Sequence, residues 1–268
     1  MQSDKIKLLT PQAPTPLELG PIADTGGLPL YRKVKRALIK LIEGGRYAPS
    51  DSLPSESTIA DSLQVSIGTL RKAVDELVYE NVLIRRQGKG TFVATHNNDR
   101  FLFQFFHVEK RGLDITQERE YPAVECVSFE KARADEDEAV ALALRPGDPV
   151  FRIGNRLTLS RRPVVYDRLS ISALTFKGLT EKRFGEREST VYHLYQRDYG
   201  ITVLRAQERA RAVAANREAS RVLGVQFGLP VMEVHRVAVT FGEKPVEYRV
   251  STINTQQHDY VSELSKRS

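Results

Sequence analysis

In the first third of the chain, apolar residues recur every three or four positions in three successive runs, which predicts three amphipathic helices. The first run spans residues 30–42 and stops at a pair of glycines. The second and third runs begin just after Ser55 and Ser66, whose hydroxyl groups can cap the first turn of a helix. Only residues 64–66 separate these two helices, and so short a connection forces a large angle between them. The pattern therefore predicts a helix-turn-helix.

Beyond the third helix, the apolar residues change from helical spacing to the alternation of β-strands. Residues 82–86 and 91–94 have the composition of two short strands, and residues 87–90 form the turn between them. Three helices followed by a basic hairpin are the layout of a winged helix. We expect residues 28–95 to form one winged helix-turn-helix domain.

The second half of the chain alternates at strand period over long, valine-rich segments bounded by Pro or Gly. Short turns join two pairs of these segments, which indicates antiparallel hairpins. Helices are expected to start near Asp135, Thr190 and Asn216. We therefore expect an α+β domain around one antiparallel sheet over residues 109–265. The predicted strands cover residues 121–129, 149–159, 162–171, 201–213, 230–241 and 244–253.

Two segments lie outside these domains. Residues 1–27 contain four prolines, end in two glycines and hold few aromatic or β-branched residues. Such a segment has little to bury, so we expect a disordered tail. Residues 96–108 are expected to be a linker that becomes a strand.

The chain is mildly basic, and the excess charge is concentrated in the first predicted domain. The net charge is +6, and residues 28–95 contain 11 Lys and Arg against 7 Asp and Glu. This excess is compatible with a polyanionic partner. No apolar run reaches the roughly 20 residues that span a bilayer, and the N-terminus lacks the apolar core of a secretory signal. We therefore expect a cytoplasmic protein with no membrane partner.

Residues that carry metal or catalytic chemistry are sparse. The single cysteine, Cys126, excludes an internal disulfide and a cysteine-rich zinc site. The five histidines have no metal-ligand spacing, and the chain contains no nucleophile elbow, phosphate-binding loop or dinucleotide fingerprint. We expect no cofactor, no bound metal and no catalytic residue.

The third predicted helix and the hairpin carry side chains that suit a DNA partner. On the outward face of the helix these are Gly68, Thr69, Arg71 and Lys72, and on the hairpin they are Arg86, Gly88, Lys89 and Gly90. Small residues let the backbone approach a groove, and the basic side chains can neutralise phosphates. Each basic residue alone could equally belong to a solvated surface, but their arrangement on one side of a winged helix favours DNA.

The stretch LPSESTIADSLQVSIGTLRKAVDELVYENVLIRRQGKGTFV resembles the DNA-binding domain of the GntR family of bacterial regulators. LPSE, the Val-Ser turn, T-L-R-x-A and G-x-GTFV stand in the family's order and spacing. The resemblance implies further DNA contacts at the helix starts, from Ser55, Ser57, Ser66 and Ile67. Ser57 and Ile67 stand where the family usually has arginines that help to read guanines, so the family's usual operator is not expected.

Residues 109–262 resemble the UTRA effector domain of the HutC subfamily, through the hairpin RRPVVYDRLSI, the helix TVYHLYQRDYGI and the strand KPVEYRVS. Such domains share the fold of chorismate lyase and bind small polar, often anionic, ligands. The implied effector-binding residues are Arg156, Thr158, Asp167, Ser189, Thr190 and Glu247. Related domains often have two arginines, two residues apart, on this strand, and Thr158 stands in place of the second. The expected affinity for an anion is therefore weaker. Alternatively, Arg156 and Asp167 form an ion pair across the strands and Thr190 only caps a helix.

Together these features predict a DNA-binding transcriptional repressor of a catabolic operon, released from its operator by a small polar or anionic metabolite. We expect a homodimer on a palindromic operator, because two recognition helices match two half-sites. Two alternatives are an enzyme of the chorismate lyase-like fold and a metal-responsive regulator. Relatives of the second kind use an all-helical effector domain, whereas residues 119–254 alternate at strand period.

Overall fold

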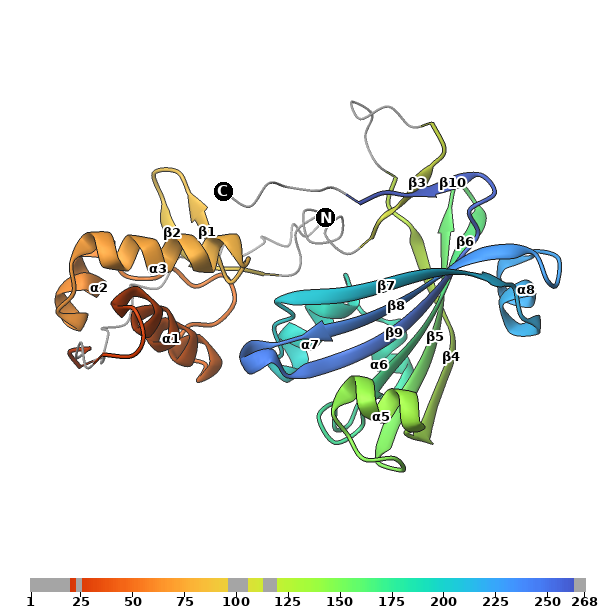
Figure 1. The fold of residues 1–268 in the computed structure, drawn as a ribbon, viewed down its shortest axis with the longest axis horizontal. Helices are drawn as coiled ribbons and strands as arrows, with labels where there is room; N and C mark the ends of the chain where they lie inside the picture. Colours follow the sequence, from red (N-terminus) through yellow and green to blue (C-terminus); the bar gives the residue numbers. More distant parts are fainter. Residues whose placement is uncertain (1–19, 23–25, 96–105, 113–119, 263–268) are drawn as a thin grey trace, which may run out of the picture. The chain divides into compact units, whose positions relative to one another are not determined.

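A computed structural model describes residues 20–22, 26–95, 106–112 and 120–262. The chain divides into two compact units, residues 1–95 and 96–268 (Figure 1). Most of the predicted tail over residues 1–27 and of the predicted linker over residues 96–108 lies outside the described residues.

The first unit contains the three predicted helices and the predicted hairpin. The elements are α1 (Leu30–Glu43), α2 (Glu56–Leu63), α3 (Ile67–Tyr79), β1 (Leu83–Arg86) and β2 (Gly90–Val93). Ser55 caps α2 by accepting a hydrogen bond from the Thr58 amide at 3.1 Å, and Ser66 caps α3 in the same way through the Thr69 amide at 3.1 Å. The apolar stripes of the three helices meet in one core built on Leu38, Ile59, Leu63, Leu70 and Leu77.

The hairpin of the first unit depends on glycine at its turn. Gly88 and Gly90 have φ values of 71° and 106°, a backbone region that residues with a Cβ rarely adopt. Lys89 stands between them at the tip, and the two strands pair antiparallel from Leu83 opposite Val93 to Arg86 opposite Gly90.

The second unit is built on one six-stranded antiparallel sheet in the order β4-β5-β6-β9-β8-β7 (Figure 1). Its strands are β4 (Ala123–Arg133), β5 (Pro149–Leu159), β6 (Arg162–Ser172), β7 (Arg205–Ala214), β8 (Pro230–Val239) and β9 (Pro245–Ile253). The predicted α+β class and the antiparallel sheet are therefore confirmed. A second sheet of two short strands, β3 (Val108–Lys110) and β10 (His258–Tyr260), joins the two ends of this unit. The sequence pattern did not predict β10.

Helices cover both faces of the large sheet. On one face α6 (Glu181–Gly185) and α7 (Val191–Tyr199) bury Phe184 and Tyr195 against Ile153 and Leu169. On the other face α5 (Glu136–Leu142) packs on Val150, and α8 (Arg217–Leu223) packs on Tyr166. A single turn of 3₁₀ helix (Phe241–Glu243) connects β8 to β9. The sequence pattern missed α6, which is too short to show a period.

In the described part of the chain, no helix combines the length and the apolar character required to cross a membrane.

Candidate functional site

A cavity of about 380 Å³ lies on the sheet face that α6 and α7 cover. Its floor comes from all six strands, and its walls come from the segment between α6 and α7, from β3 and from β10. We call it the sheet cavity. Its size is within the range of small-molecule sites, and its lining combines apolar side chains with a few charged ones, as such sites usually do.

The floor of the sheet cavity consists of alternate residues along each strand, because successive side chains point to opposite faces of a sheet. Asn155 and Leu157 of β5 line it, together with Asp167 of β6 and with Arg249 and Ser251 of β9. Asn155 lies opposite Asp167 in the register, and Asp167 lies opposite Ser251. Polar residues from three neighbouring strands therefore meet at the centre of the floor.

Arg156 and Thr158 do not line the sheet cavity, which corrects the expectation that they hold a ligand there. Arg156 is one residue out of phase with the positions that face the cavity, and its guanidinium pairs with Glu125, its partner across the β4–β5 pair. The alternative ion pair, between Arg156 and Asp167, does not form either, because Asp167 faces the cavity and pairs with Arg249.

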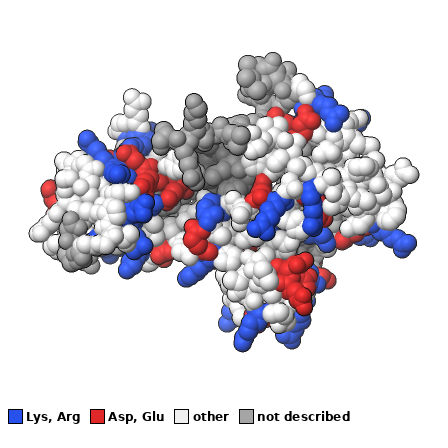
Figure 2. Space-filling model, viewed as in Figure 1, with Lys and Arg blue, Asp and Glu red and all other residues white. Residues whose placement is uncertain are grey.

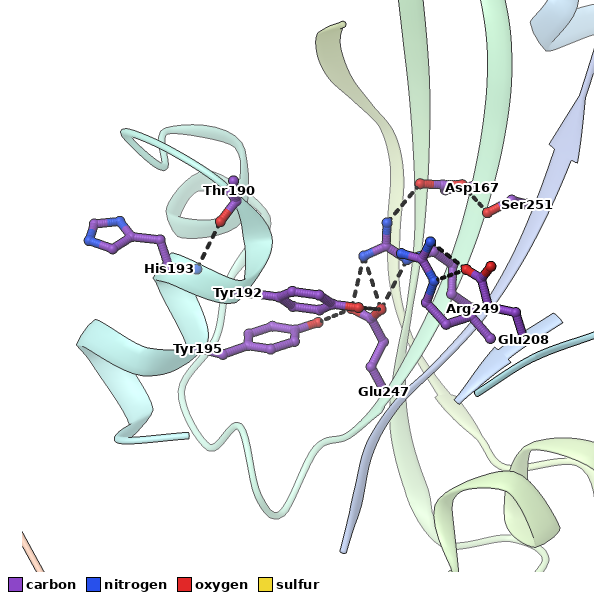
Figure 3. A network of polar contacts seen from close by, with 10 residues as sticks. Asp167, Thr190, Tyr192, His193, Tyr195, Glu208, Glu247, Arg249 and Ser251 are labelled. Atoms are coloured by element: carbon purple, nitrogen blue, oxygen red, sulfur yellow. Dashed lines mark hydrogen bonds and ion pairs between the residues drawn. The ribbon is translucent and has the colours of Figure 1, made fainter. Parts of the chain in front are cut away.

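Arg249 is the centre of a buried ionic network at the cavity floor (Figure 3). Its guanidinium donates to Asp167 at 3.0 Å and to the two carboxylate oxygens of Glu247 at 2.9 and 3.1 Å. Burial would lower the pKa of Arg249, but Glu247 and Asp167 outweigh burial and raise it. Tyr192 and Tyr195 of α7 also donate to Glu247, at 3.1 and 2.8 Å. Glu247 is fully buried beneath the cavity rather than in its lining, so it holds Arg249 and α7 in place.

A second ion pair closes the side of the cavity near β10. Arg236 of β8 donates to Glu208 of β7 at 2.5 Å, and the Tyr260 hydroxyl donates to the same carboxylate. His107 packs its ring on Tyr260 at a centroid distance of 5.4 Å. Burial raises the pKa of the Tyr260 hydroxyl, and Glu208 raises it further, so this hydroxyl remains a donor.

The segment that leads into α7 supplies the remaining polar groups of the wall. Thr190 caps α7 through the His193 amide at 3.0 Å (Figure 3), and Thr190 and Ser189 both line the sheet cavity. Arg187 lines it as well, and donates from Nη1 to the Phe184 carbonyl at 2.7 Å. Burial lowers the pKa of Arg187. Among the described residues, no carboxylate lies within ion-pair distance of this guanidinium.

Three of the six predicted effector residues therefore line one cavity, Asp167, Ser189 and Thr190, and a fourth, Glu247, lies directly beneath it. Sequence reasoning missed Asn155, Arg187, Arg236 and Arg249. Strand alternation could have indicated Asn155, which shares the phase of the buried Ile153 and Leu157, whereas both phases of β9 are buried and alternation does not distinguish Arg249. Nothing local distinguishes Arg187.

A polar cavity of about 450 Å³ on the opposite face of the sheet is a weaker candidate for a ligand site. Four of its charged groups already form ion pairs, since Arg152 pairs with Glu138 at 2.7 Å and Arg211 pairs with Glu233 at 2.7 Å. A ligand would have to displace these pairs. Among the described residues, no group of three His, Cys, Asp or Glu side chains could hold a metal ion.

In the first unit, the start of α3 and the hairpin present the predicted DNA-binding residues at the surface. Gly68, Arg71, Lys72, Arg86 and Lys89 are exposed. The surface is not uniformly basic, however, and Figure 2 shows acidic and basic side chains side by side on this unit. Ser55 and Ser66 use their hydroxyl groups as helix caps, and Ser57 lies 2.9 Å from the Ser55 hydroxyl.

Glu56 lies beside two arginines of this surface. It accepts a hydrogen bond from Arg71 at 2.7 Å and one from Arg85 at 3.2 Å. The hydrogen bond from Arg71 lowers the pKa of Glu56, so its carboxylate stays charged. Ile67, the first residue of α3, is 44% exposed, an unusual position for a large apolar side chain.

Comparison with known proteins agrees with this architecture. Residues 30–93 match the bacterial regulatory proteins of the gntR family, and residues 117–259 match the UTRA domain. The chain is a GntR-family regulator with a UTRA domain. The helices and hairpin of the first unit are thus its GntR helix-turn-helix domain, and the sheet cavity belongs to its UTRA domain.

Two curated relatives of this GntR-family regulator match most of its length, and a solved structure matches its second unit. The transcriptional repressor NagR of Bacillus subtilis is 24% identical over 243 residues, which are 90% of this chain and 97% of NagR. A histidine utilization repressor of Pseudomonas putida is 26% identical over 221 residues, which are 82% of this chain and 86% of that protein. The solved ligand-binding domain of a GntR-family regulator from Bordetella bronchiseptica is 30% identical, with a TM-score of 0.55, and the match covers 60% of this chain and 98% of that domain.

Proposed function

We propose that this protein represses a catabolic operon by binding its operator through the helix-turn-helix domain, and releases the operator when a small polar or anionic metabolite fills the sheet cavity. The observation that carries the proposal is a ligand-sized cavity with arginines in its lining, in the same chain as a winged helix. Two of the relatives, NagR and the histidine utilization repressor, are named as repressors, which supports the same role.

Operator recognition is assigned to the start of α3 and to the hairpin tip. Arg71, Lys72 and Lys89 contact phosphates in this proposal, and the small residues at the start of α3 let the helix enter the major groove. Ile67 is exposed there, and an apolar side chain suits the methyl group of thymine rather than guanine. The operator is therefore expected to carry thymine where Ile67 meets it.

The proposal includes a homodimer on a palindromic operator. A single winged helix reads one short half-site, whereas two copies related by a two-fold axis read two half-sites with the same sequence. Light scattering of the purified protein gives the oligomeric state. Anisotropy with half-site and full-site duplexes shows whether both halves are needed.

The cavity lining includes residues that lie close in sequence to the helix-turn-helix domain. Phe106, His107 and Val108 line the sheet cavity, and the first unit ends at Thr95. In this proposal, a ligand acts on the domain through these residues. The protein is proposed to have one arrangement that binds the operator and one that does not. The ligand changes operator affinity only to the extent that it binds these two arrangements with different affinities.

An enzymatic role finds little chemical support in the sheet cavity. Asp167 and Glu208 are each held by a guanidinium, and the hydroxyl groups of Tyr192 and Tyr260 have pKa values raised by burial. A general base needs a free acceptor near the reacting atom. The proposal therefore assigns binding, and no reaction, to this cavity.

The test is fluorescence anisotropy with duplexes tiled across the region upstream of the protein's own gene, at two salt concentrations. The proposal expects tight, salt-dependent binding to one palindrome in preference to scrambled DNA. Equal binding to every duplex, at both salt concentrations, would contradict operator recognition.

A further inference from the structure

Arg187 stands apart from the other arginines of the sheet cavity because no carboxylate in the described chain neutralises it. Arg236 has Glu208, and Arg249 has Asp167 and Glu247. Arg187 has only a carbonyl, at 2.7 Å, and the face of the Phe184 ring, 4.6 Å from the guanidinium carbon to the ring centroid. Its Nε is buried without a hydrogen-bond partner. A guanidinium without a carboxylate beside it carries a desolvation penalty, and an anionic ligand held by its other N–H groups would reduce that penalty.

Asn155 is a second unsatisfied group in the same cavity. Its side chain is 1% exposed, it lines the cavity floor, and its Oδ1 has no hydrogen-bond partner. Buried amide oxygens are nearly always paired, so we infer that the Asn155 amide turns to present this acceptor to an N–H or O–H group of the occupant.

The charges around the cavity limit what the occupant can be. Arg236 pairs with Glu208, and Arg249 pairs with Asp167 and with Glu247 beneath the floor, while Glu188, also in the lining, pairs with Arg197. Among the described arginines of the lining, Arg187 alone has no carboxylate partner. One negative charge can therefore be held at Arg187, whereas a phosphate monoester carries nearly two at neutral pH and would also meet the carboxylates of the floor.

Much of the remaining lining is apolar. Five strands of the large sheet contribute the aliphatic side chains of Val124, Leu157, Val165, Val234 and Ile253, and Val108 and Val191 add to them. Such a surface suits a ligand body without further charges. An anion at the wall formed by residues 187–190 would also lie near the N-terminal amides of α7, a nine-residue helix.

We propose that the effector is a small monocarboxylate with an apolar body and one hydrogen-bond donor, and that Arg187 is the residue that selects its carboxylate. Arg187 and the start of α7 hold the carboxylate, Asn155 accepts the donor, and the aliphatic wall packs on the body. This inference rests on the proposed function, since it specifies the ligand of the same cavity.

The test uses 3-phenylpropanoate, its three ring-hydroxylated derivatives, 3-phenylpropanamide, phenyl phosphate and inorganic phosphate as probes, with calorimetry on the full chain. The carboxylates are expected to bind, and the neutral amide and both phosphates at least tenfold more weakly. One hydroxylated derivative should bind more tightly than 3-phenylpropanoate, and Asn155→Leu should remove that gain. Arg187→Gln should weaken the carboxylates about tenfold or more, and Arg187→Lys should keep part of the affinity.

Two variants serve as matched controls. Arg156→Gln removes an arginine on the opposite face of the sheet, and Arg183→Gln removes an exposed arginine of α6 that pairs with Asp198 outside the cavity. Both should bind the carboxylates like the wild type. Unchanged unfolding temperatures of the unliganded variants show that they are folded.

The inference is overturned if no carboxylate binds, if the amide or a phosphate binds as tightly as the acids, or if Arg187→Gln binds them unchanged. Operator binding of each variant is measured separately, without any probe. A wild type that binds its operator while the probes contradict the assignment retains the proposed function. A wild type that fails to bind any operator loses that function, whatever the probes do.

Discussion

Removing Arg249 should destabilise the UTRA domain far more than removing an arginine from its surface. In Arg249→Met, the buried carboxylates of Asp167 and Glu247 lose their shared cation and three hydrogen bonds, although Ser251, Tyr192 and Tyr195 still donate to them. Two uncompensated charges would then remain at positions that are 2% and 0% exposed. Breaking a buried pair in this way costs about 3–5 kcal/mol of unfolding free energy.

The assay is thermal and urea unfolding followed by circular dichroism, with the signal of buried tyrosines in the near ultraviolet, because the chain has no tryptophan. For a domain of this size, the expected loss lowers the unfolding temperature by roughly 6–20 °C. Arg156→Met is the matched control. Its partner Glu125 is exposed, so the loss should stay within about 1 kcal/mol.

A second substitution tests the physical reason. Adding Glu247→Gln to Arg249→Met removes one uncompensated charge and should recover part of the lost stability, although the same change alone removes charge-assisted hydrogen bonds. The reasoning is refuted if Arg249→Met costs less than 1 kcal/mol, or if Glu247→Gln lowers the stability of that variant further.

Four further predictions concern DNA, effector and pH. Arg71→Ala should weaken binding to every duplex and reduce the slope of log affinity against log salt by about one, and an unchanged slope in anisotropy titrations would contradict a phosphate contact. Ile67→Arg should shift the preferred base from thymine to guanine at one position of each half-site, worth about 1–3 kcal/mol, as read by selection from a randomised operator. Arg156→Ala should leave effector-induced operator release intact, and loss of the response would return this residue to the effector site. Burial raises the pKa of Glu138, but hydrogen bonds from Arg152 and Ser170 outweigh burial and leave this pKa lowered. The contribution of Glu138 to folding stability is therefore complete above about pH 4.5 and is lost as the pH falls through the lowered pKa. The unfolding temperatures of wild type and Glu138→Gln should converge in acid, and a constant difference down to about pH 2 would contradict this.

Arg156 was predicted as a ligand contact and Arg249 was not, yet Arg249 is the one that lines the sheet cavity. The difference shows how strand alternation decides which side chains form a binding site in a sheet. Arg156 matches the arginine that related domains carry on this strand, but the residues on either side of it, Asn155 and Leu157, are the ones that line the cavity. A shift of one position moves a side chain to the other face, and irregularities in the register occur on both neighbouring strand pairs of β5. Local pattern therefore located the strand but not the face that binds.

Much of the architecture follows from the sequence alone. Helical spacing, the hydroxyl caps at Ser55 and Ser66, and the glycines of the hairpin specify a winged helix, because each of these effects acts within a few residues. Strand alternation and short turns likewise specify an antiparallel sheet in the second unit. These local terms all favour the same elements that the structure contains.

The sheet cavity was decided only by the tertiary structure. The described lining of the cavity contains three arginines, one from a loop and two from strands, which differ in whether a carboxylate neutralises them. Glu208 neutralises Arg236 and Asp167 neutralises Arg249, and both carboxylates lie elsewhere in the chain. Arg187 has no carboxylate partner in the described chain. Whether a buried guanidinium is neutralised or left to receive a ligand is a property of the charges packed around it. Sequence spacing carries no record of those charges, because folding brings them together from opposite ends of the domain.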